Sequence, residues 1–241
     1  MSLPSVDGLD LRLKGPVLQV TMQRGEANLM SMEMCRVLTD LLFQPPAGAR
    51  VMHLRASGPA FCLGRDRGQS GEDGLREEAE TLVRLNRALS AGKLVTVAEV
   101  AGDAAGYGVG LAALSDLSFV SPSARIWFPE VEAGLAPTVV LSWLPALVGR
   151  SRAFRLVASG VRIDGCEAAR IGLFTAVAES AEQLPELVAS EVDMLLHHSP
   201  QPQWEIRAFL DETLGARSLN IDQLSVERLV TSSLRLSRAA H

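Results

Sequence analysis

Four glycines, at positions 102, 106, 108 and 110, interrupt an apolar stretch that runs from Val97 to Leu114. The apolar run before them predicts a strand, and the Ala- and Leu-rich run after them predicts a helix. Such a turn leaves backbone N–H groups free at a helix N-terminus, where a partial positive charge can hold an anion or a developing oxyanion. The stretch is therefore the first candidate for a ligand site.

A second loop that contains a glycine, Phe61 to Asp66, follows the predicted strand 51–56, and a carboxylate, Glu130, follows a further predicted strand. Backbone N–H donors can stabilise an oxyanion, and a carboxylate can move protons as a general base and acid. In an apolar pocket beside Trp127 and Phe128, the pKa of Glu130 should rise toward the working pH. Taken singly, each loop is also consistent with a tight turn, and Glu130 with a solvated surface acid.

The glycines from Gly102 to Gly108 also match the GxxxGxG pattern of short-chain dehydrogenases. That pattern belongs after the first strand of a nucleotide-binding domain, whereas about a hundred residues precede it here. These enzymes use a Tyr and a Lys four residues apart, but Tyr107 is the only tyrosine and Leu111 stands four residues later. The dehydrogenase interpretation is therefore disfavoured, and no GxSxG or P-loop sequence supports a serine hydrolase or an NTPase.

The 241 residues are 47% hydrophobic and 21% charged, which is typical of a globular protein. The net charge of −5 disfavours a nucleic-acid partner, because phosphate binding needs clustered Lys and Arg. The three cysteines and four histidines have the spacing of neither a disulfide framework nor a metal site, so we expect no metal. The sequence has no signal-peptide pattern and no apolar run of the ~18 residues that a membrane span needs, so we expect a cytoplasmic protein.

Alternating strands and helices must position the candidate residues. A hairpin is predicted at 9–13 and 17–22, a helix at 31–43, and a mobile surface loop at 67–74 before a helix at 75–91. Further strands are predicted at 95–100, 117–121, 125–128 and 175–179. Further helices are predicted at 138–148, with an interruption at Pro145, at 151–160 and at 164–171, and the chain from about 182 to 239 is predicted to be mostly helical. This order indicates an α/β core followed by a C-terminal helical region.

Three blocks of the sequence occur in the order and spacing of one family. Phe61 to Asp66 resembles an F-x-x-G-x-D loop, and Gly102 to Asp116 resembles the second glycine block of the same family. The third block consists of the stretches 129–135, 147–153 and 163–168, and the resemblance covers about residues 9–180. Together these blocks make the chain similar to the enoyl-CoA hydratase/isomerase, or crotonase, superfamily.

The resemblance implies a crotonase-like spiral core of ββα units at 1–195 and a C-terminal helical oligomerisation region at 196–241, assembled as a homotrimer or hexamer. It also implies an acyl-CoA thioester as substrate, with no permanently bound cofactor. By resemblance the N–H groups of Leu63 and Tyr107 form an oxyanion hole and Glu130 is the catalytic base. The implied substrate-binding residues are Gly64, Gly106, Gly108, Phe61 and Trp127.

The carboxylates favour one branch of this family. Hydratases carry two glutamates that hold and activate water; Glu130 occupies the second position and Gly110 the first. A single glutamate is similar to the enoyl-CoA isomerases, which shuttle one proton between two carbons of the same substrate. We therefore expect isomerase-like proton transfer on an enolate. Hydration, decarboxylation or another enolate reaction stays open as an alternative, and so does a catalytically silent acyl-CoA-binding protein.

Overall fold

A computed structural model describes residues 3–68, 71–214 and 219–239 of the chain. Its larger sheet has six strands in the order β1-β2-β3-β5-β7-β10. Only β1 and β2 run antiparallel, and the later neighbours are parallel, as an alternation of strands and helices requires. The strands are β1 (Leu9–Lys14), β2 (Val17–Met22), β3 (Val51–Ala56), β5 (Val95–Val100), β7 (Leu117–Val120) and β10 (Ala176–Val177). The predicted α/β class is confirmed.

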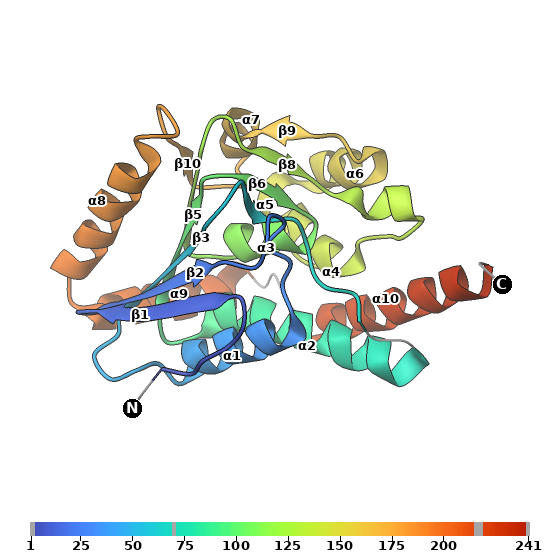
Figure 1. Cartoon of the computed structure of the whole chain (residues 1–241), viewed down its shortest axis with the longest axis horizontal. Coiled ribbons are helices and arrows are strands. Elements are labelled where there is room, and N and C mark those ends of the chain that lie inside the picture. Colours follow the sequence, from blue (N-terminus) through green and yellow to red (C-terminus); the bar gives the residue numbers. More distant parts are fainter. Residues whose placement is uncertain (1–2, 69–70, 215–218, 240–241) are drawn as a thin grey trace.

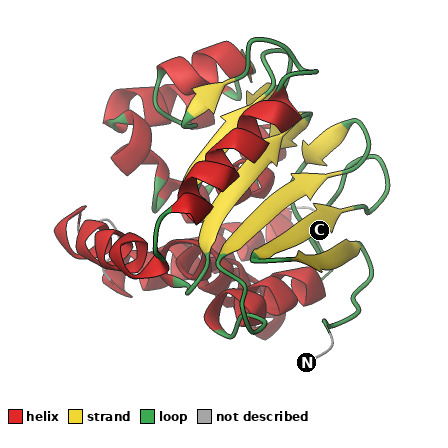
Figure 2. Ribbon diagram, turned by 90° about the vertical axis from the view of Figure 1, so that its left-hand side faces the viewer, coloured by secondary structure: helices red, strands yellow, loops and turns green. Residues whose placement is uncertain are grey.

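Helices cover both faces of this sheet, as Figures 1 and 2 show. On one face lie α1 (Met32–Phe43), α2 (Gly71–Ala91) and α3 (Tyr107–Ala113). On the other, α8 (Leu184–His197) lies across the strands and buries an apolar stripe against β5 and β7 (Figure 2). The apolar residues of the parallel strands are therefore buried from both sides, which explains their nearly continuous hydrophobic runs.

The segment that was expected to be a mobile surface loop at 67–74 is partly helical. The helix α2 begins at Gly71 instead of at the predicted residue 75. Its first turn contains Glu72 and Asp73, and negative charges there interact favourably with the helix dipole. The polar composition of this segment therefore does not indicate a loop. Residues 69–70 lie outside the described part of the chain.

A smaller sheet carries the loops of interest. Its four strands lie in the order β4-β6-β8-β9, and β4, β6 and β8 are parallel neighbours. The strands are β4 (Ala60–Cys62), β6 (Asp103–Ala105), β8 (Arg125–Trp127) and β9 (Ile163–Asp164). These short pairings were not all predicted, because two or three residues of strand show no hydrophobic period.

The rest of the chain is mostly helical. The predicted helix at 138–148 is divided into two, but the division lies at residues 142–143 and not at Pro145, which lies in the first turn of the second helix. The helices are the 3-10 helix η1 (Pro129–Ala133), α4 (Thr138–Leu141), α5 (Leu144–Val148), α6 (Arg150–Ser159), α7 (Gly165–Arg170), α9 (Pro200–Leu214) and α10 (Leu219–Ala239). None of the helices in the described part of the chain is long and apolar enough to span a membrane.

The helices α9 and α10 form most of the segment 196–241, whose residues 215–218 and 240–241 lie outside the described part. The division at residue 195 falls inside α8 and stays a prediction. Both helices pack against α2 of the same chain, and α10 also packs against α4. The C-terminal segment therefore contributes directly to the body of the protein.

Arg207 fastens α9 to the core. Its guanidinium donates to Asp116 Oδ1 at 2.8 Å and to backbone carbonyls at the end of α2, among them Leu89 O at 2.9 Å and Ser90 O at 3.0 Å. A cation at this place satisfies carbonyls that have no partner within the helix. Only 11% of the Arg207 side chain is exposed, so water cannot easily replace these bonds.

We expect Arg207→Met to lower the free energy of unfolding by about 2–3 kcal/mol, because it leaves Asp116 Oδ1 and the carbonyls at the end of α2 without the donor that Arg207 provides. Urea denaturation followed by circular dichroism measures this loss. The matched control is Arg228→Met at an exposed position of α10, which should change the free energy of unfolding by less than about 0.5 kcal/mol. Equal effects of the two substitutions would contradict the assignment.

Candidate active site

The carboxyl ends of three parallel strands meet at one place. The segments that leave β4, β6 and β8 are 63–65, 106–107 and 128–130, and all three contribute to the wall of one cavity of about 150 Å³. Ligands of parallel sheets commonly bind at the carboxyl ends of the strands. The fold thus brings together two glycine loops and a carboxylate that are separated by up to about 70 residues in the sequence.

Gly106 and Glu130 lie against each other in this cavity. Gly106 has φ +51° and ψ −119°, a conformation that L side chains avoid. A Cβ atom at this position would lie only 2.7 Å from Glu130 Oε1. Glycine is therefore required here for two reasons, the backbone conformation and the space occupied by the carboxylate.

Glu130 is held in the first turn of η1, directly after Pro129. Its Oε2 atom is buried and has no hydrogen-bond partner within the described residues. Burial raises the pKa of Glu130 above its usual value, because the charged form loses its hydration; its own backbone N–H and the cations of Arg67 and Arg65 act in the opposite direction. A carboxylate with a raised pKa and an unsatisfied oxygen is suited to accept and return a proton.

The backbone of the first loop shows which N–H groups are available. The Leu63 N–H donates to Ala27 O at 2.9 Å, so the prediction that it serves the oxyanion is wrong. A β-bridge joins Met30 to Arg65, with Met30 N–H donating to Gly64 O and Asp66 N–H to Met30 O. This pattern directs the Arg65 N–H to the opposite side from Met30, and no acceptor for it exists among the described residues.

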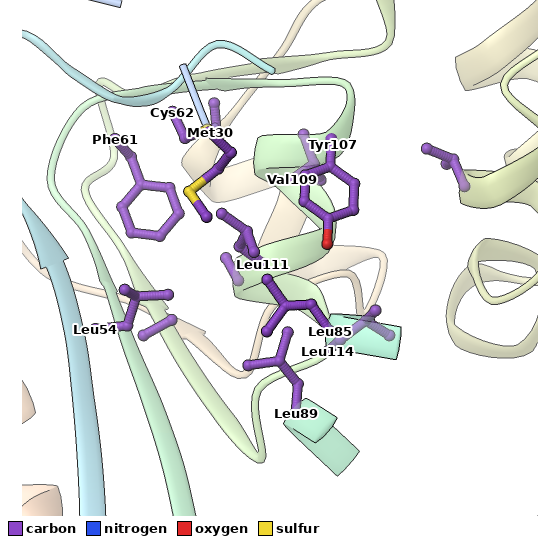
Figure 3. Close-up of a cluster of buried hydrophobic side chains, with 14 of the residues drawn as sticks. Met30, Leu54, Phe61, Cys62, Leu85, Leu89, Tyr107, Val109, Leu111 and Leu114 are labelled. Carbon is purple, nitrogen blue, oxygen red and sulfur yellow. The ribbon is translucent and has the colours of Figure 1, made fainter. Parts of the chain in front are cut away.

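Tyr107 contributes its backbone to the cavity and its side chain to the core. Its N–H, at the first position of α3, has no acceptor within the described part of the chain. The ring lies among buried apolar side chains such as Val109 and Leu111 (Figure 3), and its hydroxyl donates to Leu82 O at 3.1 Å. Burial raises the pKa of Tyr107 well above its usual value, so its hydroxyl is no acid or base at neutral pH.

Two aromatic residues that were predicted to bind substrate do not line the cavity. Phe61 is 1% exposed and belongs to the same buried cluster as Met30 and Leu54 (Figure 3). Trp127 is 8% exposed and lies under the guanidinium of Arg162, 4.5 Å from the ring centroid. These aromatic side chains support the site from within the core, because the strands that carry them point them away from the cavity.

Gly108 has a packing role rather than a place at the cavity wall. A Cβ atom there would lie 2.1 Å from Cys62 O, so glycine allows α3 to approach the strand β4 closely. Gly64 and Gly106, by contrast, line the cavity, and their contact with substrate stays a prediction. The substrate-binding assignment of Gly108 is therefore corrected to close packing between two elements of the site.

Several cavity residues were not assigned to the site from the sequence. Arg67 lines the cavity, and so do Leu82 of α2 and Leu229 of α10, which come from helices far apart in the sequence. Arg65 turns its guanidinium toward the buried carboxylate of Glu78 on α2, and burial lowers the pKa of Arg65 to about 10. The acidic residue in the apolar stripe of α2 was the one signal in the sequence that could have pointed to this ion pair.

Comparison with known families gives a consistent result. A family model described as enoyl-CoA hydratase/isomerase matches residues 12–234. A probable enoyl-CoA hydratase of Rhodobacter capsulatus is 35% identical over 162 residues, which cover 64% of this chain and 62% of that relative. Cyclohexa-1,5-dienecarbonyl-CoA hydratase of Thauera aromatica is 30% identical over 175 residues, which cover 71% and 67%. The aligned part thus spans slightly less than two thirds of the first relative.

Solved structures resemble the chain over nearly its whole length. An enoyl-CoA hydratase from Mycobacterium avium subsp. paratuberculosis has a TM-score of 0.86 at 26% identity, with 95% of each chain covered. An enoyl-CoA hydratase/isomerase from Marinobacter aquaeolei has a TM-score of 0.79 at 26% identity, with 95% of this chain and 92% of that chain covered. The overall fold is therefore shared with these proteins.

Proposed function

The chain belongs to the enoyl-CoA hydratase/isomerase family, and from that premise we propose that it moves a proton within an enoyl-CoA thioester, with Glu130 as its single acid–base group. One observation carries the proposal: the Glu130 carboxylate, whose Oε2 atom is buried, lies against Gly106 in a cavity that Tyr107 also lines, and the Tyr107 N–H has no acceptor among the described residues. No second carboxylate lines that cavity within the described residues.

The N–H groups of Arg65 and Tyr107 form the oxyanion hole in this proposal. Removal of a proton next to a thioester carbonyl places negative charge on the carbonyl oxygen. Two backbone donors aimed at that oxygen stabilise the charge, and the loss of one such donor in other enzymes costs about 3–4 kcal/mol of transition-state stabilisation. Because the donors are main-chain atoms, the Arg65 and Tyr107 side chains are free to pair with Glu78 and to pack in the core.

Glu130 then acts twice. It removes a proton from C2 of a 3-enoyl thioester, and the electron pair of that C–H bond forms a dienolate whose charge rests on the thioester oxygen. The protonated Glu130 returns the proton at C4, the carbonyl re-forms, and the double bond lies between C2 and C3. No other reactant is consumed, so one carboxylate is sufficient.

Hydration of a 2-enoyl thioester is the second candidate, because the relatives from Rhodobacter and Thauera are named hydratases. Purified protein tests both. We expect conversion of a 3-enoyl-CoA to its 2-enoyl isomer at least about 100-fold faster than hydration of a 2-enoyl-CoA, because only the first reaction needs a single base. Faster hydration would overturn the proposed reaction, and saturable thioester binding without turnover would identify a binding protein.

Assembly as a homotrimer or hexamer and a cytoplasmic location stay predictions.

The proposed base predicts a pH dependence. Because burial raises the pKa of Glu130, kcat/KM should fall on the acidic side as the carboxylate becomes protonated, at a higher pH than an exposed glutamate would give. Arg67 favours the ionised form, so Arg67→Gln should move this acidic limb to higher pH, whereas Arg67→Lys should leave it nearly in place. Measurement of kcat/KM from about pH 4 to about pH 9 for the wild type and both variants tests this prediction. An acidic limb that moves to lower pH in the Gln variant would contradict the assignment.

A further inference from the structure

Gly110 lies on the same face of α3 as Gly106, one turn further along the helix. Residues four apart on a helix are neighbours, and side chains lean toward the helix N-terminus. A side chain at position 110 would therefore extend toward Gly106, whose own Cβ position is 2.7 Å from Glu130 Oε1. Position 110 is thus the place on α3 from which a second functional group would reach the Glu130 side of the cavity.

The indole ring of Trp143 occupies this space. A Cβ atom on Gly110 would lie 3.2 Å from Trp143 Cζ2, 3.6 Å from Cε2 and 3.7 Å from Nε1. Trp143 is 2% exposed, and its ring packs against Phe128, two residues before Glu130, with ring centroids 6.5 Å apart. Because the ring is packed in the core, a longer side chain on Gly110 would collide with it.

We propose that Trp143 is a specificity-determining residue: its indole excludes a second carboxylate and the water that such a carboxylate would hold, and thereby limits the site to proton transfer by Glu130 alone. The inference rests on the proposed function. Hydration requires the oxygen of a water to bond to C3 and one of its protons to end at C2, so it needs a group that holds the water and takes that proton. The Trp143 ring occupies the space beside Gly110 in which the side chain of such a group would have to lie.

Substitution of Gly110 and of Trp143, singly and together, tests the inference through the ratio of the hydration rate to the isomerisation rate. We expect Gly110→Glu alone to raise this ratio by less than about 3-fold, since the ring blocks the carboxylate. Gly110→Glu combined with Trp143→Ala should raise it at least about 10-fold, a part of the roughly 10²-fold or more that a well-placed acid–base group contributes. Trp143→Ala alone is the control for the opened space. An unchanged ratio in the folded double variant, or an equal rise in Gly110→Glu alone, would overturn the inference.

A stability cycle gives a readout that needs no turnover. Gly110→Ala should lower Tm by about 4 °C or more through crowding against Trp143. Trp143→Phe removes the crowded edge of the ring, so Gly110→Ala should lower Tm by at most half as much when it is made in the Trp143→Phe variant. Additive effects would overturn the contact on which the inference depends. Absence of isomerase turnover in the wild-type protein would instead contradict the proposed function, so the two failures are distinguishable.

Discussion

Glu130→Gln is expected to lower kcat/KM for isomerisation of a 3-enoyl-CoA by about 10³-fold, within the range that general acid–base catalysis contributes. Gln has the shape of Glu but cannot accept the C2 proton, so the loss should fall on kcat rather than on thioester binding. Steady-state kinetics and the Kd of a saturated acyl-CoA separate these two effects. A variant that keeps more than about a tenth of the wild-type rate would exclude Glu130 as the base.

The chain offers a matched control two residues away. Glu132 lies in the same 3-10 helix but is exposed, so Glu132→Gln removes an equal charge from the same element without touching the cavity. Its kcat/KM should stay within about 3-fold of the wild type. A similar loss in both variants would mean that the net charge of η1, and not the position of one carboxylate, determines the rate.

Stability provides an independent check on the same residue. The pKa of Glu130 is raised in the folded protein, so ionisation of this group costs stability once the pH exceeds its unfolded pKa. Gln carries no charge, so at neutral pH the Glu130→Gln variant should have a Tm equal to or above that of the wild type. Lost activity with retained or increased stability is the result expected for a residue that serves function at the expense of the fold.

The parts of the site that could be predicted are those that depend on local sequence. The two glycine loops and Pro129-Glu130 each follow a predicted strand, and parallel strands bring their carboxyl ends to one edge. A glycine often marks an unusual backbone conformation or a close approach between two elements. Gly106 shows both, and Gly108 shows the close approach. These signals need no knowledge of the tertiary structure.

The parts that failed depend on partners far away in the sequence. Leu63 and Arg65 are two residues apart, and only the segment 27–30, through Ala27 O and the bridge at Met30, decides which of the two N–H groups is bonded within the protein. The burial of Phe61 and Trp127 depends on which side of each strand faces the core, and strands of three residues show no period from which to read this. Trp143 is separated by 33 positions from Gly110, so their contact leaves no local pattern.

The contact between Gly106 and Glu130 leads to the second large effect. Gly106→Ala should lower kcat/KM by about 10²-fold, because the added Cβ lies 2.7 Å from Glu130 Oε1 and the carboxylate must move. A misplacement of about 1 Å in a catalytic group is sufficient for a loss of this size. The terminal atoms of a glutamate can rotate away, so we expect the protein to fold and to bind the thioester while its base is displaced.

Gly15→Ala separates this displacement from backbone strain. Gly15 has φ +56°, close to the φ of +51° at Gly106, but a Cβ atom there meets nothing within 4 Å. Both substitutions should cost about 1–3 kcal/mol of stability through strain, more at Gly106, where ψ is −119°. Only Gly106→Ala should reduce kcat/KM when both variants are assayed well below their Tm. If both variants lost activity in proportion to their loss of stability, backbone strain alone would explain the effect. If Gly106→Ala kept the wild-type rate, the Glu130 carboxylate would have to act from a position other than the one beside Gly106.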